Sequence, residues 1–422
     1  MLNTVNLIFW LIVGTLVIYV SIYLTFMSNF LQFRFIKMIK EISKKKDING
    51  ISSFKTLMIS LGGKIGVGSI SGVAIAIYYG GPGIIFWMII ISFLLAILTF
   101  YEVFLGNYYK EIDYGNINKG GPYYYIKKGL KNNILSYLYS LLVFICYNVC
   151  FLSIQSNTII KMANLYININ PIIIGIVLCI LILLIIHKGL YLIAKVSNII
   201  VPIMLIIYIL FSFIILLKNL NNIDEMVSLI MNNAFRIKSL IFSFIPMIIM
   251  AIQRTIFATE SGIGTSAIIS STTRDNPLKQ AYIQLLGVYI TSLIICVSTA
   301  IIILFTKFHQ LQLQDINGIE LVIYAFNYHF GNKGNILLFI IVLLFCLSTI
   351  ITGYFNGESC AKSIHLNNLF LLKLITIIII FIGFFIQSLL LWSLADILIG
   401  LILLINCYAI YKLRNKVKEE IK

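Results

Sequence analysis

The chain has 422 residues, of which 60% are hydrophobic and 11% charged, with a mean hydropathy of +1.01 and a formal net charge of +16. Soluble globular proteins are roughly 45–50% apolar and about 25% charged, so the composition excludes a soluble enzyme. The high aliphatic content, the aperiodic Gly residues and only seven Cys exclude disordered, collagen-like and disulfide-stapled secreted chains. What remains is an all-α integral membrane protein.

Apolar runs long enough to cross a bilayer follow one another along the whole chain. The unbroken runs exclude an outer-membrane barrel, which needs short segments of alternating polarity. We expect about eleven transmembrane helices, at approximately 4–27, 54–79, 83–109, 134–163, 171–187, 193–217, 239–269, 281–306, 335–360, 368–391 and 393–411.

The basic residues are distributed unevenly between the loops that these spans define. Loops on one side, together with the C-terminal tail, carry 21 of the 31 Lys and Arg residues, and loops on the other side carry six. Cytoplasmic loops are enriched in Lys and Arg, so we expect a multi-pass protein of the plasma or inner membrane with its N-terminus outside and its C-terminus inside. The net charge then reflects topology, and a nucleic-acid partner is not expected.

Two of the spans are interrupted by Gly clusters that also contain a charge. The first, from Gly62 to Gly72, holds five Gly and Lys64, and the second, from Phe257 to Ser266, holds Glu260. Small residues can simply let membrane helices pack closely. The density of Gly, hydroxyl and charged groups favours a different interpretation, in which unwound backbone lines a polar cavity.

The interrupted spans are the second and the seventh, so each would open a set of five helices. Five is odd, which predicts a 5+5 inverted repeat with one extra N-terminal helix, the plan of many secondary transporters. This plan divides the chain into a peripheral helix with a basic cytoplasmic loop (1–53), a first repeat (54–218), an extracellular connection (219–238), a second repeat (239–412) and a basic cytoplasmic tail (413–422).

Half-helix ends offer the chemistry of a sodium-coupled carboxylate site. Free N–H groups and the partial positive charge of a helix N-terminus suit a carboxylate, while freed carbonyls and hydroxyls suit a sodium ion. Ser348 and Thr349 are adjacent hydroxyls in an apolar run, although such a pair also bonds back to its own helix. Gln155 fits a binding role or a role in holding helices together. Glu102 and Arg254 are candidates for an ion pair or a gate.

Other chemistries find no support in the sequence. No P-loop is present, so ATP is not expected, and no nucleophile–base pair or metal-ligand spacing indicates an enzyme. A channel, a proton- or lithium-coupled transporter of amino acids and a non-transporting amino acid sensor remain alternatives.

Several sequence motifs, in the same order along the chain, resemble those of the alanine/glycine:cation symporter family, the amino acid carrier proteins. The family's VGTGNIAGVATA and GGPGAxFWMW resemble Ile65–Ala74 and Gly80–Met88. Its GGPMYYIEKGL and NEAGLGSAP resemble Gly120–Leu130 and Thr259–Ala267. Gln155 and the Ser348–Thr349 pair also match in place and type.

This resemblance implies a leucine-transporter-like fold that imports a small neutral amino acid, alanine- or glycine-like, together with sodium. The substrate site would be formed by Gly66, Val67, Gly68, Ser69, Gln155, Ile256, Phe257, Thr259 and Gly353. The sodium ligands would be Gly62, Ile65, Ser348 and Thr349.

The chain departs from the family pattern within this pocket. Ser69 and Thr259 stand where the family has Asn, and Gly353 stands near the place of the family's pocket Trp. A missing Trp would widen the pocket for a larger substrate, unless Tyr354 fills the space.

Overall fold

The computed structural model describes residues 2–43, 51–111, 118–166, 170–235, 244–306 and 318–421. Within these ranges the regular secondary structure is helical, and the β-type pairing is limited to one isolated bridge between Glu111 and Lys119. The longer helices are α1 (Leu2–Met27), α2 (Phe35–Ser43), α3 (Ser53–Lys64), α4 (Val67–Gly80), α5 (Ile84–Tyr108), α7 (Asn133–Ile145), α8 (Leu152–Tyr166), α9 (Pro171–His187), α10 (Leu190–Lys218), α11 (Ile223–Ala234), α12 (Ile245–Thr259), α14 (Pro277–Tyr289), α15 (Val297–Leu304), α16 (Ile319–Ser363), α17 (Leu369–Gly383) and α18 (Ser388–Ile421). Short α-helices are α6 (Pro122–Tyr124) and α13 (Thr265–Ser270).

The apolar spans expected from the sequence coincide with helices wherever the structure describes them. Among the described residues, eight helical segments are long and apolar enough to cross a membrane, and α9, α12 and α17 are shorter apolar helices. A π-helical turn at Cys146–Phe151 joins α7 to α8, and another at Ile290–Cys296 joins α14 to α15, so each pair runs on as one rod.

One expected boundary is wrong. Hydropathy predicts a boundary between the last two spans at 391–393, whereas α17 ends at Gly383 and α18 begins at Ser388. Hydropathy cannot locate this turn because residues on both sides of it are apolar. Trp392, which falls between the two expected spans, therefore lies in the second turn of α18 and packs, half-buried, against Phe257.

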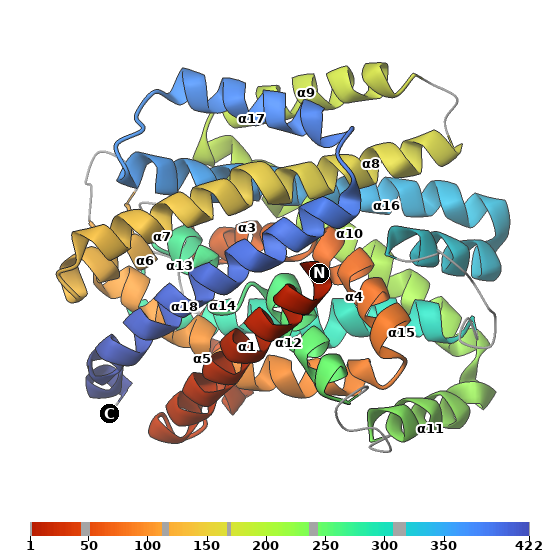
Figure 1. Cartoon of the computed structure of the whole chain (residues 1–422), viewed down its shortest axis with the longest axis horizontal. Coiled ribbons are helices and arrows are strands. Elements are labelled where there is room, and N and C mark those ends of the chain that lie inside the picture. The colour runs from red at the N-terminus through yellow and green to blue at the C-terminus, as the bar shows by residue number, and fades with distance from the viewer. Residues whose placement is uncertain are drawn as a thin grey trace.

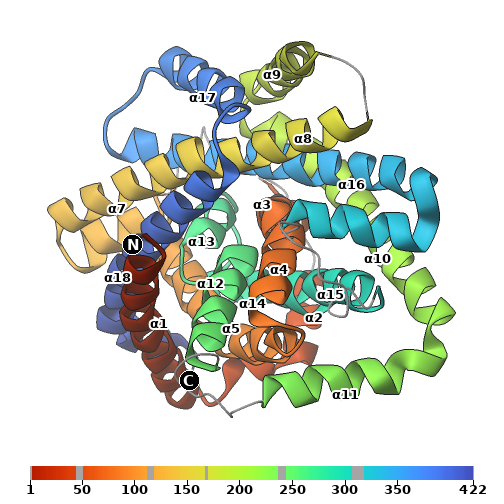
Figure 2. The same ribbon diagram turned by 45° about the vertical axis from the view of Figure 1, so that its right-hand side comes forward.

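The Gly-containing helices α3 and α4 form the centre of the molecule. Over an apolar stretch of 18 residues within this pair of helices, 94% of the residues are buried. Figure 2 shows α3, α4, α12 and α13 enclosed by α5, α8, α14, α16 and α18, while α9 and α17 lie side by side at the periphery. In Figure 1, α1 crosses in front and packs on α18 and α5. The polar groups of the breaks are thus held away from lipid.

Both central helices break at the Gly clusters, as the sequence predicts. Between α3 and α4, Ile65 has ψ 78° and Gly66 is extended, with φ −131° and ψ −153°. Between α12 and α13, Glu260 has φ 53°, and Gly262 and Gly264 have φ 81° and 101°. Left-handed backbone costs a glycine little, which explains why the second turn needs Gly at two positions.

Candidate functional site

The first break brings together backbone of α3 and α4 with a side chain of α8. The N–H of Val67, at the start of α4, donates to Oε1 of Gln155 at 3.2 Å. The hydroxyl of Ser69 donates to the carbonyl of Gly66 at 3.0 Å. Gly66, Val67, Ser69 and Gln155, all predicted substrate residues, therefore meet at one buried place.

Hydroxyls of α16 lie against the other side of the same break. The carbonyl of Gly62 accepts hydrogen bonds from Ser348 Oγ at 3.1 Å and Thr349 Oγ1 at 3.0 Å. A Cβ on Gly66 would lie only 2.3 Å from Thr349 Oγ1, so the extended backbone passes directly beside that hydroxyl. Ile65 directly follows α3 and has non-helical backbone angles. The four predicted sodium ligands thus lie on two facing segments.

The donor set fits a sodium ion in chemical type. One backbone carbonyl and two hydroxyls are neutral hard oxygens, buried where water does not compete. Both hydroxyls also bond back to the carbonyl of Phe345, at 2.9 Å for Ser348 and 3.0 Å for Thr349. The local back-bonding considered for this pair is therefore present alongside the contact with Gly62. Because Gly62 lies on another helix, back-bonding alone does not account for the arrangement.

An aromatic column covers the first break on the α12 side. Phe257 stacks on Phe151 with ring centroids 4.7 Å apart, and it packs at a tilt of 35° against Trp392 with centroids 4.6 Å apart. A Cβ on Gly68 would lie 2.6 Å from Phe257 Cδ1, so the phenyl ring rests on the backbone of Gly68. Ile256, also predicted for the pocket, is completely buried beside it. A carboxylate can reach the N-terminal turn of α4 only if the Phe257 ring moves.

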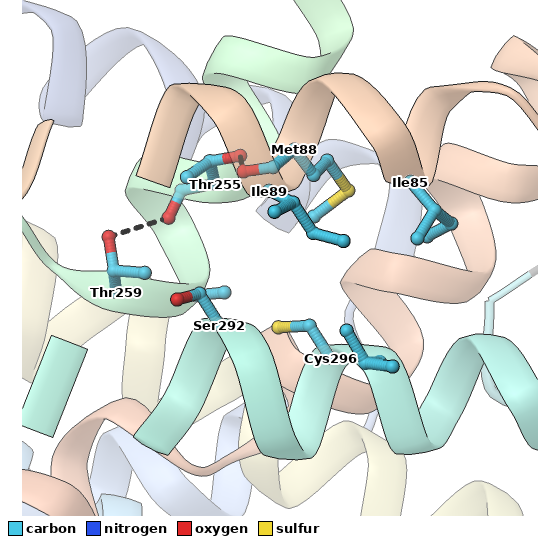
Figure 3. A pocket seen from close by; sticks show the side chains of 9 residues that line it. Ile85, Met88, Ile89, Thr255, Thr259, Ser292 and Cys296 are labelled. Atoms are coloured by element: carbon cyan, nitrogen blue, oxygen red, sulfur yellow. Dashed lines mark hydrogen bonds between the residues drawn. The ribbon is translucent and has the colours of Figure 1, made fainter. Parts of the chain in front are cut away.

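Thr259 lies at a small cavity on the far side of α12. Its hydroxyl donates to the carbonyl of Thr255 at 2.8 Å, and both threonines face Ser292 and Cys296 across the cavity (Figure 3). The volume is about 10 Å³. A cavity needs roughly 10–15 Å³ to hold one water molecule, so an amino acid does not fit here in this conformation.

In the part of the chain that the structure describes, Gly353 lines neither this small cavity nor the large cavity described below. A Cβ at this position would lie 3.1 Å from Leu152 Cδ1 and 3.8 Å from Tyr147 Cδ1. The next residue, Tyr354, is completely buried. The expected wider pocket is therefore not open here, because Leu152 and Tyr147 occupy the space beside Gly353.

The second break is closed by its own side chains and two neighbouring tyrosines. Glu260 Oε2 accepts a hydrogen bond from Thr265 Oγ1 at 2.6 Å, and Oε1 accepts one from the hydroxyl of Tyr147 at 2.9 Å. The hydroxyl of Tyr139 donates to the carbonyl of Ile263 at 2.7 Å. Hydrogen bonds from its own segment and from two other helical segments therefore hold this turn.

The buried charges pair differently from the sequence-based candidates. Arg254 forms its ion pair with Asp396 of α18, not with Glu102. Glu102 accepts from Asn406 Nδ2 at 3.3 Å, and the same amide donates to the carbonyl of Gly262 at 2.7 Å. Lys64 is 1% exposed, so its amine stays inside the protein and does not extend to a membrane surface.

A large cavity of about 620 Å³ lies at the end of the molecule where α4 finishes and α12 begins. Its lining includes Ser71, Lys161, Arg254, Trp392 and Asp396. The sequence suggested Glu102 as a partner for Arg254, and it indicated neither the pairing with Asp396 nor the cavity. Trp392 was missed because it fell in the expected gap between two spans.

The opposite end of α3 is held by Asp275, which follows α13. Its carboxylate accepts hydrogen bonds from Ser53 and from Gln280 Nε2, the latter at 3.0 Å, and pairs with Lys279 at 2.9 Å. Burial works against ionisation, but the hydrogen bonds from Lys279, Ser53 and Gln280 outweigh it and lower the pKa of Asp275. Asp275 therefore links the first residue of α3 to the first turn of α14 at this end of the molecule.

Known proteins resemble the chain along its whole length. The profile of the family described as Sodium:alanine symporter family matches residues 1–422. The chain is 32% identical over 410 residues to the probable sodium/glutamine symporter GlnT of Bacillus subtilis, covering 95% of this chain and 85% of that protein. It is 28% identical over 442 residues to the sodium/alanine symporter AgcS of Methanococcus maripaludis, covering 100% and 96%.

Solved structures of more distant transporters share the fold. A Na⁺-coupled sialic acid symporter superposes with a TM-score of 0.56 at 13% identity, covering 92% of this chain and 82% of the other. A manganese transporter of Eremococcus coleocola gives 0.53 at 15% identity, covering 87% and 80%. At this level of identity the likeness concerns the arrangement of helices alone.

Proposed function

Because the chain belongs to the sodium:alanine symporter family, and is therefore a multi-pass membrane transporter, we propose that it couples inward sodium movement to the import of a small neutral amino acid by alternating access. The observation that carries the proposal is the meeting of the Gly62 carbonyl with the hydroxyls of Ser348 and Thr349 beside an unwound helix. Unwound backbone carbonyls are the sodium ligands of such transporters.

In this proposal the first break does two tasks. Gly62, Ile65, Ser348 and Thr349 hold the sodium ion, and the N-terminal turn of α4 at Gly66–Ser69 binds the substrate carboxylate. Gln155 holds the N–H of Val67, and the aromatic ring of Phe257 covers the site. When bound, the sodium ion would supply positive charge that bridges α3 to α16. The hydroxyls of α16 can then bind the ion tightly only when α16 lies close to α3.

The remaining parts of the architecture follow from the same proposal. Of eleven membrane helices, ten would form a 5+5 inverted repeat and α1 would be the extra helix, with the N-terminus outside and the C-terminus in the cytoplasm. The large cavity would then face outward and the Asp275 cluster would face the cytoplasm. Relatives named for glutamine and for alanine support a neutral amino acid and leave its size to experiment.

Uptake into proteoliposomes tests the proposal. Labelled alanine and labelled glutamine are offered under an inward gradient of sodium, lithium or protons, with each unlabelled amino acid as competitor. We expect accumulation only under the sodium gradient, competed by neutral amino acids. Accumulation driven equally by a proton gradient would reassign the coupling ion, and binding without accumulation would indicate a sensor.

A further inference from the structure

The ion pair of Arg254 and Asp396 leaves several of its polar atoms without a partner. One oxygen of Asp396 accepts from Arg254 Nη2. Within the described part of the chain, Nε and Nη1 of Arg254 and Oδ1 of Asp396 have no hydrogen-bond partner. Both residues are at least nine-tenths buried, with 5% and 4% exposure. Buried polar groups are almost always hydrogen-bonded, so unpaired donors and an unpaired acceptor side by side need an explanation.

The unpaired atoms belong to residues that line the large cavity. Its volume of about 620 Å³ falls within the range of roughly 300–1,000 Å³ typical of small-molecule sites. Four charged side chains line it, Arg254 and Lys161 against Asp396 and Glu320, so its formal charge is balanced. A balanced lining suits a zwitterion better than a free anion or cation.

The two kinds of unpaired atom match the two ends of an amino acid. The guanidinium N–H donors of Arg254 complement a carboxylate, which planar Arg binds especially well. The free oxygen of Asp396 complements an ammonium group. The Arg254 guanidinium carbon lies 5.1 Å from the ring centre of Trp392, which also lines the cavity. The same Trp392 ring packs at a tilt against Phe257, the ring that covers Gly68.

We propose that Arg254 and Asp396 form a second, outer binding site for a zwitterionic α-amino acid, between the large cavity and the first break. The carboxylate binds Arg254 and the ammonium group binds Asp396, after the Trp392 ring turns aside. Because Trp392 packs on Phe257, this movement also loosens the ring that covers the inner site. The inference rests on the proposed function, since it presumes that an amino acid travels this route.

The outer site differs from the inner one in its need for sodium. None of the predicted sodium ligands lines the large cavity. The outer site should therefore bind amino acid without sodium, whereas the inner site should require it. Equilibrium binding with and without sodium separates the two.

The test measures binding of labelled alanine and glutamine to purified full-length protein in nanodiscs. We expect one amino acid per chain in choline buffer and two in sodium buffer. The double variant Arg254→Gln/Asp396→Asn, which removes both charges together, should bind none without sodium and one with it. Its uptake KM should rise about tenfold, since charge-assisted pairing is lost.

Lys161→Gln is the matched control. It removes the other cation lining the cavity, whose amine donates to Ser388 Oγ at 3.0 Å, and it should leave both stoichiometries unchanged. Loss of sodium-free binding in Lys161→Gln but not in the double variant would overturn the assignment.

A labelling experiment keeps the proposal testable if the double variant does not fold. Ser393 lines the large cavity, and all seven native cysteines are buried, so Ser393→Cys offers a single accessible thiol. Alanine or glutamine in choline buffer should slow its reaction with a maleimide. No protection, together with one bound amino acid per chain only in sodium, would overturn the outer site and leave the proposed function standing. No binding in any buffer, with no uptake, would overturn both.

Discussion

The two broken helices interrupt the centre of the molecule in different ways. At the first break, the groups around the backbone come from other helices, Gln155 from α8 and Ser348 and Thr349 from α16. At the second, Glu260 bonds to Thr265 only five residues further along the same segment. Tyr147 and Asn406 also bond to the second break from other helices, but there both oxygens of Glu260 already accept a hydrogen bond. The first break therefore depends on how close its neighbours are, and the carboxylate of the second already has its partners.

This difference indicates which break can respond to an ion. A cation among oxygens from two helices changes the free energy of bringing those helices together, which is the requirement for coupling binding to movement. The second break, whose carboxylate already accepts two hydrogen bonds, gains little from a further ligand. We therefore expect substitutions at the second break to act on stability and substitutions at the first to act on sodium binding.

The largest loss of stability is expected from Gly264→Ala at the second break. Gly264 has φ 101°, and a Cβ there would lie 2.2 Å from Pro122 Cγ and 2.4 Å from the Tyr139 hydroxyl. Overpacking and left-handed strain together should cost about 3 kcal/mol or more. The measurement is the melting temperature of the purified protein.

Gly189→Ala provides the control for backbone strain alone. Gly189 also has positive φ, 67°, but nothing lies within 4 Å of its Cβ position. Its ψ of −159° is a conformation that side-chain-bearing residues rarely adopt, so the substitution should cost about 1–3 kcal/mol, without any steric clash. Equal melting temperatures for the two variants would contradict the steric argument.

The double variant Ser348→Ala/Thr349→Ala is expected to weaken sodium binding. Removing both hydroxyls leaves the Gly62 carbonyl without its partners from α16. The sodium concentration for half-maximal uptake should rise about 10–100-fold. Thr352→Val removes the next hydroxyl on the same face, which donates to Ile59 at 3.2 Å, and should leave that concentration nearly unchanged. A similar shift in both variants would argue against a specific ion site.

Tyr147→Phe should have a moderate effect, confined to stability. It removes the hydrogen bond to Glu260 Oε1 and leaves a buried carboxylate oxygen unpaired, which costs about 1–3 kcal/mol. Thermal unfolding should shift down while the half-maximal sodium concentration stays the same. A changed sodium response with unchanged unfolding would reverse the roles assigned to the two breaks.

The smallest effect is expected from Asp275→Asn, just beyond the second break. The folded-state pKa of Asp275 is lowered, so its contribution to stability is present above the unfolded-state pKa and is lost as pH falls through the folded-state value. The wild type should melt above the variant at neutral pH, and the gap should close below about pH 4. A gap that is independent of pH would show that the charge of Asp275 is not what holds Ser53.

Much of the fold could be read from the sequence because its signals are local. Length and hydropathy of the apolar runs marked the helices, and Gly clusters marked both breaks, since glycine is poor at continuing a helix. The turn between α17 and α18 was misplaced because Phe384 to Ile386 are as apolar as the helices around them. There the only polar signals are Gln387 and Ser388.

The candidate site was predictable in part. Gly62 and the Ser348–Thr349 pair were named from their chemistry and from the family motifs, and the structure brings them into contact. The pairing of Arg254 with Asp396 was not predicted, because 142 positions separate them and several other charges were available. The filling of the space beside Gly353 by Leu152 was equally invisible, since no local pattern reports which side chain packs there.

The sequence by itself determined the membrane class of the chain, the positions of its two breaks and the type of atoms that the breaks expose. These depend on composition and on backbone preferences within a few residues. Only the tertiary structure decided which side chains meet across the breaks and that Phe257 covers Gly68. It also decided that Arg254 and Asp396 line a large cavity and that, within the described residues, some of their polar atoms have no hydrogen-bond partner. Such contacts depend on how helices distant in sequence pack together, where burial and shape select one partner among several of equal chemistry.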